Sequence, residues 1–319
     1  LILRGANNGT KRALILRAGR HQIRHGDRDM IETTDHHKPS NYPATLWALP
    51  PQAARGAMSL EVARGRCMLT PTHQTKAQIA MAEKRFGAPL HDWVAPAFPT
   101  ADTLKGRFVT LAPLSPETHA APLFAANAAQ PAMWDYLPYG PFDTLNAYET
   151  WMRTATAGHD PQFYALSDHQ SQPGQWGGVA SYLRITPEIG SIEVGHIALS
   201  AQMQRRPAAT EAMYLMMARA FAAGYRRYEW KCDALNLPSR RAAQRLGFSY
   251  EGTFRQATIV KGRNRDTAWF AVTDQEWPAL SAAHAAWLAP ENFTPDGQQC
   301  LRLSDLTTPC RVSSDPALG

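Results

Sequence analysis

The chain has 319 residues, of which 44% are hydrophobic and 19% charged, a balance typical of a folded globular protein. Its net charge of +6 lies in residues 1–80, where 12 Lys and Arg stand against 5 Asp and Glu. Residues 81–319 contain 21 Lys and Arg and 22 Asp and Glu, and are therefore nearly neutral. The overall charge therefore gives no reason to expect a polyanion as partner of the whole chain.

Apolar runs and cysteine spacing exclude further classes of protein. No apolar run reaches the roughly 18–20 residues that span a bilayer, and no signal peptide is visible. The four cysteines have no CxxC spacing, and His21 and His25 lack the carboxylate or cysteine that would complete a metal site. We therefore expect a cytoplasmic protein, monomeric or homodimeric, with no metal, no membrane partner and no nucleic acid partner.

Residues 1–80 show no apolar period of 3.6 or 2, and five prolines interrupt them. We expect a basic extension that is disordered or does not belong to the native protein, followed by a linker at 81–103. A nucleic-acid-binding role is the alternative for this extension, but few aromatic residues accompany its basic clusters to stack on bases.

Between residues 104 and 288 the apolar pattern alternates between strand and helix periods, which predicts one α/β domain. A polar tail is predicted at 289–319. Strands are predicted at 107–111, 162–166, 176–185, 191–199, 227–232, 248–254 and 267–273, and helices at 116–127, 144–157, 207–223, 239–246 and 275–288.

The first informative motif joins a predicted strand to a predicted helix through the basic loop Gln204-Arg-Arg-Pro-Ala-Ala209. Backbone N–H groups and the positive end of the helix dipole at such a turn bind pyrophosphate. Arg205 and Arg206 would add full positive charges. The alternative is that two arginines at a helix start only form a solvated face.

The second motif follows the predicted strand 227–232. Asn236 lies in the loop, Ser239 is placed to cap a short helix, and Gly247 is placed to end that helix. An Asn at the end of a strand is suited to bind an amide of an extended ligand, and it is equally suited to a turn.

Together the two motifs resemble the GNAT acyltransferase superfamily, in particular the branch of the ribosomal-protein-alanine N-acetyltransferases. The resemblance spans about residues 106–277. Its signature is Asn236-x-x-Ser239, Leu246-Gly-Phe, Glu251-Gly-Thr-Phe-Arg255 and Lys261-Gly-Arg-Asn-Arg-Asp-Thr267. It implies a mixed, mostly antiparallel twisted sheet flanked by helices, with a V-shaped cofactor gap between two central parallel strands.

The resemblance also implies acetyl-CoA as co-substrate, bound in that gap. The backbone N–H near Leu199 would polarise the thioester carbonyl. The pantetheine arm would contact Ile197, Ala198, Leu199, Asn236 and Ser239. The pyrophosphate would rest on the loop that contains Gln204, Arg205, Arg206, Ala208, Ala209 and Thr210.

Glu193 is the residue that we expect to act as general base. An attacking amine must lose a proton, and a strand carboxylate that faces the gap can accept it, directly or through water. The alternative is an outward-facing Glu193 paired with an arginine. His196, three positions on, lies on the opposite side of an ideal strand, so we expect a packed histidine rather than the base.

Two positions depart from the pattern of the superfamily. Pro207 stands where the loop usually has a glycine, and it removes one N–H donor. Ala243 stands seven residues after Asn236, where a tyrosine often protonates the leaving thiolate. Tyr228 and Tyr250 are alternative donors, and a thiol with a pKa of ~8.5 can leave without a strong acid.

The predicted function is transfer of an acetyl group from acetyl-CoA to the primary amine of a protein N-terminus or a small molecule. The aromatic segment that contains Trp134, Tyr136, Tyr139 and Phe142 would shape the acceptor site, or simply pack in the core. The alternative is a non-catalytic acyl-CoA-binding or regulatory module, which an outward-facing Glu193 would favour.

Overall fold

The computed structural model describes residues 86–170 and 175–319, so the extension predicted at 1–80 lies outside the described residues. The described strands form one sheet in the order β1-β2-β3-β4-β5-β6-β8-β7, and all neighbours are antiparallel except β5 and β6. The strands are β1 (Leu104–Lys105), β2 (Val109–Pro113), β3 (Gln162–Asp168), β4 (Trp176–Thr186), β5 (Ser191–Leu199), β6 (Arg227–Asp233), β7 (Ser249–Val260) and β8 (Arg263–Thr273). The predicted fold class is confirmed.

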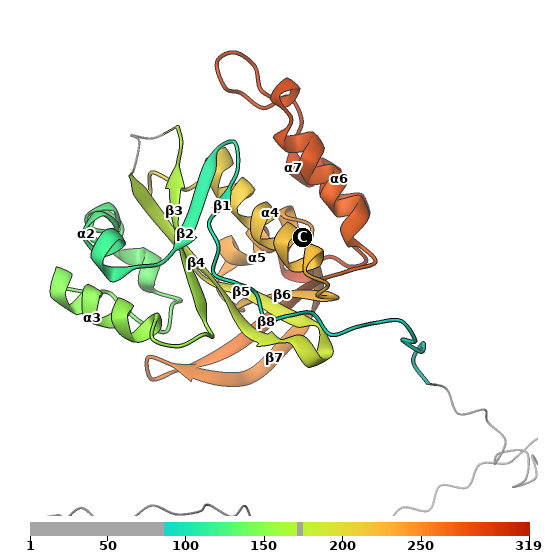
Figure 1. The fold of residues 1–319 in the computed structure, drawn as a ribbon, viewed down its shortest axis with the longest axis horizontal. Helices are drawn as coiled ribbons and strands as arrows, with labels where there is room; N and C mark the ends of the chain where they lie inside the picture. The colour runs from blue at the N-terminus through green and yellow to red at the C-terminus, as the bar shows by residue number, and fades with distance from the viewer. Residues whose placement is uncertain (1–85, 171–174) are drawn as a thin grey trace, which may run out of the picture. The chain divides into compact units, whose positions relative to one another are not determined.

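Helices cover both faces of this sheet (Figure 1). The helices are α2 (Pro116–Asn127), α3 (Leu145–Ala155), α4 (Pro207–Ala222), α5 (Leu237–Arg245) and α6 (Trp277–Leu288). Side chains alternate across the strands, so Phe163 belongs to the core under α2 and α3, whereas Tyr164 belongs to the core under α4. The hydroxyl of Tyr182 donates to the carbonyl of Met216 on α4 at 2.6 Å, which fixes α4 against the sheet.

The parallel pair β5 and β6 is joined only at its beginning. The ladder ends at Val194 and Trp230, although β5 continues to Leu199 and β6 to Asp233, and no described ladder pair joins the two strands farther on. The other edge of β5 stays paired with β4 as far as Leu199. The carboxyl halves of β5 and β6 therefore diverge, and this divergence is the predicted V-shaped gap.

A buried carboxylate attaches α4 to the first strands of the sheet. Glu211 accepts hydrogen bonds from the backbone N–H groups of Arg107, Phe108 and Val109 at 2.8, 2.6 and 2.9 Å. A Cβ atom at Gly106 would lie 2.3 Å from the carboxylate carbon of Glu211, so a side chain at this position would displace the carboxylate. These bonds hold the N-terminal end of α4, where the predicted pyrophosphate loop joins it.

Residues 290–319 contain the short helices η3 (Pro290–Asn292), α7 (Leu303–Thr307), η4 (Thr308–Cys310) and η5 (Pro316–Leu318). Leu303 is buried in the main core. Asp315 accepts two hydrogen bonds from Arg240 on α5, both at 2.6 Å, and both side chains are buried. A polar segment without a clear period is therefore packed on the domain by a few specific contacts.

Candidate active site

A cavity of about 450 Å³ lies at the divergent ends of β5 and β6, and we call it the main cavity. The β7–β8 hairpin and the segment around Tyr136 complete its wall. Glu193, Ile197, Asn236 and Ser239 are the predicted site residues that line it. Its other polar lining side chains include Arg184, His196, Lys231, Asp233, Arg265 and Trp269.

Glu193 faces the main cavity and is also paired with cations. Its Oε2 lies 2.8 Å from Nη1 of Arg184 on β4 and 3.0 Å from Nζ of Lys231 on β6. Its side chain is only 4% exposed. Burial raises the pKa of Glu193 above its usual range, and the charges of Lys231 and Arg184 oppose that rise. The carboxylate is thus a buried group whose basicity the neighbouring cations restrain.

Lys231 is a central residue of the cavity that the sequence analysis did not single out. Its Nζ also lies 2.7 Å from Oε2 of Glu229 and 3.7 Å from the ring centroid of Trp269. A lysine between two carboxylates and over an indole face is held in one place. Glu229 and Lys231 alternate along one strand, which indicates that their side chains share a face. The sequence could not show that Lys231 also contacts Glu193 on β5 and Trp269 on β8, because these residues are remote in sequence.

His196 lies on the same side of β5 as Glu193, so the prediction that the two face opposite ways is wrong. The pairing with β4 shifts in register next to Ser181, and His196 has a φ of 50°. Such a bulge interrupts the alternation of side chains. Nδ1 of His196 lies 2.8 Å from Oγ of Ser181, and its ring stacks on Phe163 with centroids 4.9 Å apart. Burial lowers the pKa of His196 to about 4, which keeps the ring neutral near pH 7.

The loop before α4 keeps several features that suit a pyrophosphate. Arg205 is exposed with a φ of 61°, and Arg206 directly precedes Pro207, the first residue of α4. The side chain of Gln204 donates to the carbonyl of Leu199 at 2.9 Å, which ties the loop to the end of β5. Nε of Arg206 lies 3.2 Å from Oδ2 of Asp168, so this arginine is braced by a buried carboxylate.

The small residues after Pro207 have different surroundings. Ala208 is completely buried, and the N–H of Ala209 donates to the carbonyl of Arg206 at 3.2 Å. The hydroxyl of Thr210 accepts from Nη1 of Arg245 at 3.1 Å. The helix start therefore offers fewer free N–H donors than a glycine-rich loop, and its positive charge comes from the arginines.

Asn236, not Ser239, is the N-cap of α5, which corrects the predicted start of that helix. Oδ1 of Asn236 accepts from the N–H of Ser239 at 3.1 Å. The hydroxyl of Ser239 accepts from Nε1 of Trp230 at 3.0 Å. Both residues still line the main cavity, so the turn and ligand-contact interpretations of Asn236 are compatible.

The aromatic segment divides between the main cavity and the core. Tyr136 is partly exposed and lines the main cavity, and its hydroxyl donates to the carbonyl of Leu235 at 3.3 Å. Trp134 and Phe142 instead pack edge to face, with centroids 5.3 Å apart, and belong to the core under α2 and α3. Tyr139 stacks near Trp151 in the same cluster, at 4.3 Å.

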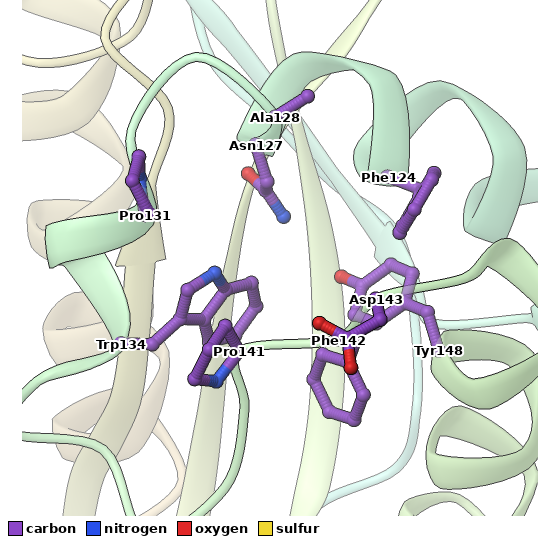
Figure 2. A pocket seen from close by; sticks show the side chains of 9 residues that line it. All are labelled: Phe124, Asn127, Ala128, Pro131, Trp134, Pro141, Phe142, Asp143 and Tyr148. Atoms are coloured by element: carbon purple, nitrogen blue, oxygen red, sulfur yellow. The ribbon is translucent and has the colours of Figure 1, made fainter.

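A second cavity of about 260 Å³ is lined in part by members of this aromatic cluster (Figure 2). Trp134, Phe142 and Tyr148 form apolar walls, and the side chain of Asn127 points into it from the end of α2. Tyr148 is only 1% exposed, whereas Ala128, Pro131, Pro141 and Asp143 in the same wall are exposed, so the cavity is open to solvent on one side. The second cavity contains none of the predicted site residues Glu193, Asn236 or Ser239.

The two tyrosines that were alternative proton donors to the leaving thiolate do not line the main cavity. Tyr228 is fully buried in the core under α4, and burial raises the pKa of its hydroxyl. The hydroxyl of Tyr250 lies 2.9 Å from Oγ1 of Thr253. Neither tyrosine, nor Ala243, belongs to the wall of the main cavity.

The fold and the divergent strand pair define the class of protein. The model of the acetyltransferase (GNAT) domain family matches residues 109–249. A GCN5-related N-acetyltransferase from Brucella melitensis is 45% identical, with a TM-score of 0.66 over 69% of this chain and 100% of that chain. The chain belongs to the GNAT acetyltransferase family.

A second solved structure, described as a probable acetyltransferase of the GNAT family from Chromobacterium violaceum, is 39% identical, with a TM-score of 0.58. The match covers 61% of this chain and 98% of that chain. None of the curated proteins matches the sequence. In residues 86–170 and 175–319, no helix is long and apolar enough to cross a membrane, and no group of three or more His, Cys, Asp or Glu side chains could hold a metal ion.

Proposed function

We propose that this acetyltransferase transfers the acetyl group of acetyl-CoA to a primary amine, with Glu193 as general base. The observation that carries the proposal is the position of Glu193 in the wall of a cavity that opens between the divergent ends of β5 and β6. A cofactor threaded through the gap would bring its thioester to this carboxylate. A protein N-terminus and a small-molecule amine are both candidate acceptors.

The cofactor would be held by backbone and loop groups. The edge of β5 at Ile197, Ala198 and Leu199 is unpaired on the β6 side, which supports hydrogen bonding to the pantetheine amides. Arg205 and Arg206 at the start of α4 supply charge for the pyrophosphate. Arg206 is already paired with Asp168, so the exposed charge of Arg205 would be the main compensation for the N–H donor lost at Pro207.

The reaction would proceed by direct attack. The nitrogen of the neutral amine attacks the thioester carbonyl carbon, and a backbone N–H near Leu199 stabilises the negative oxygen. The C–S bond then breaks, the amide C–N bond remains, and CoA leaves as a thiolate. The proton from the amine passes to Glu193, directly or through water, and later to solvent or to the thiolate.

The alternative of a non-catalytic acyl-CoA-binding module would be favoured by an outward-facing Glu193, and the lining of the main cavity argues against that orientation. The deciding experiment incubates the full chain with acetyl-CoA and a panel of alkylamines, aminocarboxylates and peptides, and measures release of free thiol. Amine-dependent thiol release supports the enzyme. Stabilisation by acetyl-CoA without thiol release on the whole panel would contradict the proposal.

A further inference from the structure

Arg265 on β8 is a cation of the main cavity for which the described part of the chain provides no hydrogen-bond or ion-pair partner. Its Nε atom is buried without any hydrogen bond. Arg265, Thr267 and Trp269 alternate along β8, and all three line the main cavity, so their side chains share one face of the sheet. The guanidinium group therefore belongs to the cavity wall.

The other cations of the main cavity are occupied by anions. Arg184 pairs with Glu193, and Lys231 pairs with both Glu193 and Glu229. Arg265 differs from them because it has no such neighbour, although the same cavity surrounds it.

Two carboxylates near Arg265 in the chain or the sheet accept hydrogen bonds elsewhere: Asp266 is the next residue, and Asp233 on β6 pairs with Thr267. Oδ1 of Asp266 accepts from the N–H of Gln256 at 2.7 Å and from Nδ2 of Asn264 at 3.0 Å. Oδ1 of Asp233 accepts from the N–H of Leu235 at 2.8 Å. Among residues 86–170 and 175–319, no carboxylate forms an ion pair with Arg265.

A buried polar atom without a partner costs free energy, and native proteins rarely leave one without a role. A guanidinium group stays charged at every physiological pH, and its fork of N–H donors matches a carboxylate or a phosphate. Nε1 of Trp269, on the same face of β8, is a second buried donor without a partner. Two unsatisfied donors in one cavity indicate a ligand with acceptor oxygens.

We propose that Arg265 binds an anionic group of the acceptor, so that the acceptor is an amine that carries a carboxylate or phosphate at its far end. This inference rests on the proposed function, because it assigns the reacting amine to the Glu193 end of the same cavity. Trp269 pairs with Lys231 across the sheet, and Arg265 lies four residues farther along β8. At about 3.4 Å per residue the two backbone positions are about 14 Å apart, so we expect an acceptor in which several bonds separate the amine from the anion.

The test uses the full chain and a ladder of ω-aminocarboxylates with increasing numbers of methylene groups. Each is compared with the alkylamine of the same length and with the corresponding aminoalkyl phosphate, and kcat/KM is measured by thiol release. We expect the anionic acceptors to be preferred, with an optimum at intermediate length. Carboxylate and phosphate are distinguished by which of the two series reaches the higher kcat/KM.

Arg265→Gln should reduce kcat/KM for the preferred anionic acceptor by roughly 10- to 100-fold and reduce kcat/KM for the matched alkylamine far less, so that the preference for the anion is lost. Arg263→Gln is the matched control, since Arg263 is exposed on the same strand, outside the wall of the main cavity. It removes the same charge and should retain the preference. Equal losses in the two variants would indicate a general charge effect and overturn the proposal.

A binding measurement separates this inference from the proposed function. The chain is saturated with CoA, and binding of the same aminocarboxylates is followed by calorimetry in the parent and in Arg265→Gln. Weaker binding in Arg265→Gln supports the inference even when no acetylation occurs. Absence of binding for the whole ladder overturns it, as does a loss of acetyl-CoA affinity in Arg265→Gln, which would assign the arginine to the cofactor.

Discussion

Glu193 and Lys231 lie on the two parallel strands that diverge to form the gap, and their Oε2 and Nζ atoms are 3.0 Å apart. Glu193 is in register with Glu229, so Lys231 is one same-face position farther toward the opening. Both side chains are nearly buried, at 4% and 8% exposure. The pair therefore joins β5 to β6 by side chains at the end of the backbone ladder, where Glu193 is still paired and Lys231 is the first residue beyond it.

Replacing Glu193 by Gln should lower kcat by about 10²- to 10⁴-fold, the usual contribution of a general base. The affinity for acetyl-CoA should change little, because the amide keeps the size of the side chain. Steady-state thiol release and calorimetric titration with acetyl-CoA measure the two quantities.

Glu229→Gln is the matched control for this change. It removes the same charge next to Lys231, but Glu229 is not part of the cavity wall. Turnover should fall far less than in Glu193→Gln. Equal turnover in the two variants would remove Glu193 from the mechanism.

Replacing Lys231 by Met should move the acidic limb of the pH profile to higher pH. The charge of Lys231 opposes the rise in the pKa of Glu193 that burial causes, so its removal raises that pKa further. Glu193 accepts a proton only as the carboxylate, above its pKa, and activity should therefore appear at a higher pH. The measurement is kcat/KM from pH 5 to 9 with one amine.

Lys231→Arg keeps the positive charge, so the acidic limb of its pH profile should lie close to that of the parent chain. His196 should add no transition near its ordinary pKa, because burial lowers its pKa to about 4. An acidic limb that does not move in Lys231→Met would mean that Glu193 does not control it.

Arg205→Gln should weaken acetyl-CoA binding without changing kcat. Arg205 is exposed just before α4, and an exposed ion pair contributes about 0.2–1 kcal/mol, so we expect KM for acetyl-CoA to rise up to roughly five-fold. The effect should shrink at high salt because of screening. Arg302→Gln, at another exposed position, is the control and should leave KM unchanged. A fall in kcat alone would contradict a role in cofactor binding.

Asp315→Ala should destabilise the domain by about 3–5 kcal/mol, because it leaves the buried charge of Arg240 without its partner. Arg240 also donates to the carbonyl of Ala234 at 2.7 Å, next to the loop that holds Asn236. Urea unfolding measures the loss. Asp305→Ala removes an exposed carboxylate, and its free energy of unfolding should stay within about 0.5 kcal/mol of that of the parent chain. Similar values for both variants would mean that the buried pair contributes little.

The sequence indicated the class of protein and most elements from β2 to α6, but not the helices of residues 290–319 or the full length of the β7–β8 hairpin. The strand predicted at 191–199 and the helix predicted from 207 coincide with β5 and with the start of α4. Apolar periodicity is a local property, and each of these segments contains its own signal. The motif residues Asn236 and Ser239 line the main cavity, as the resemblance implied, and their place shortly after β6 could also be recognised locally in the sequence.

The tertiary structure decided which side chains meet. The alternation rule placed His196 opposite Glu193, and the bulge beside Ser181 reversed that result. A positive φ at a non-glycine residue leaves no mark in a single sequence, because the neighbouring strand enforces it.

The partners of Glu193 were likewise decided by the tertiary structure. Arg184 lies on β4, Lys231 on β6, and Arg265 reaches the cavity from β8. Hydrophobic patterning is repeated along each segment and can be recognised locally, whereas an ion pair between strands depends on the register of the whole sheet. The sequence therefore determined the family and the position of the gap, and the tertiary structure decided the charges that surround Glu193.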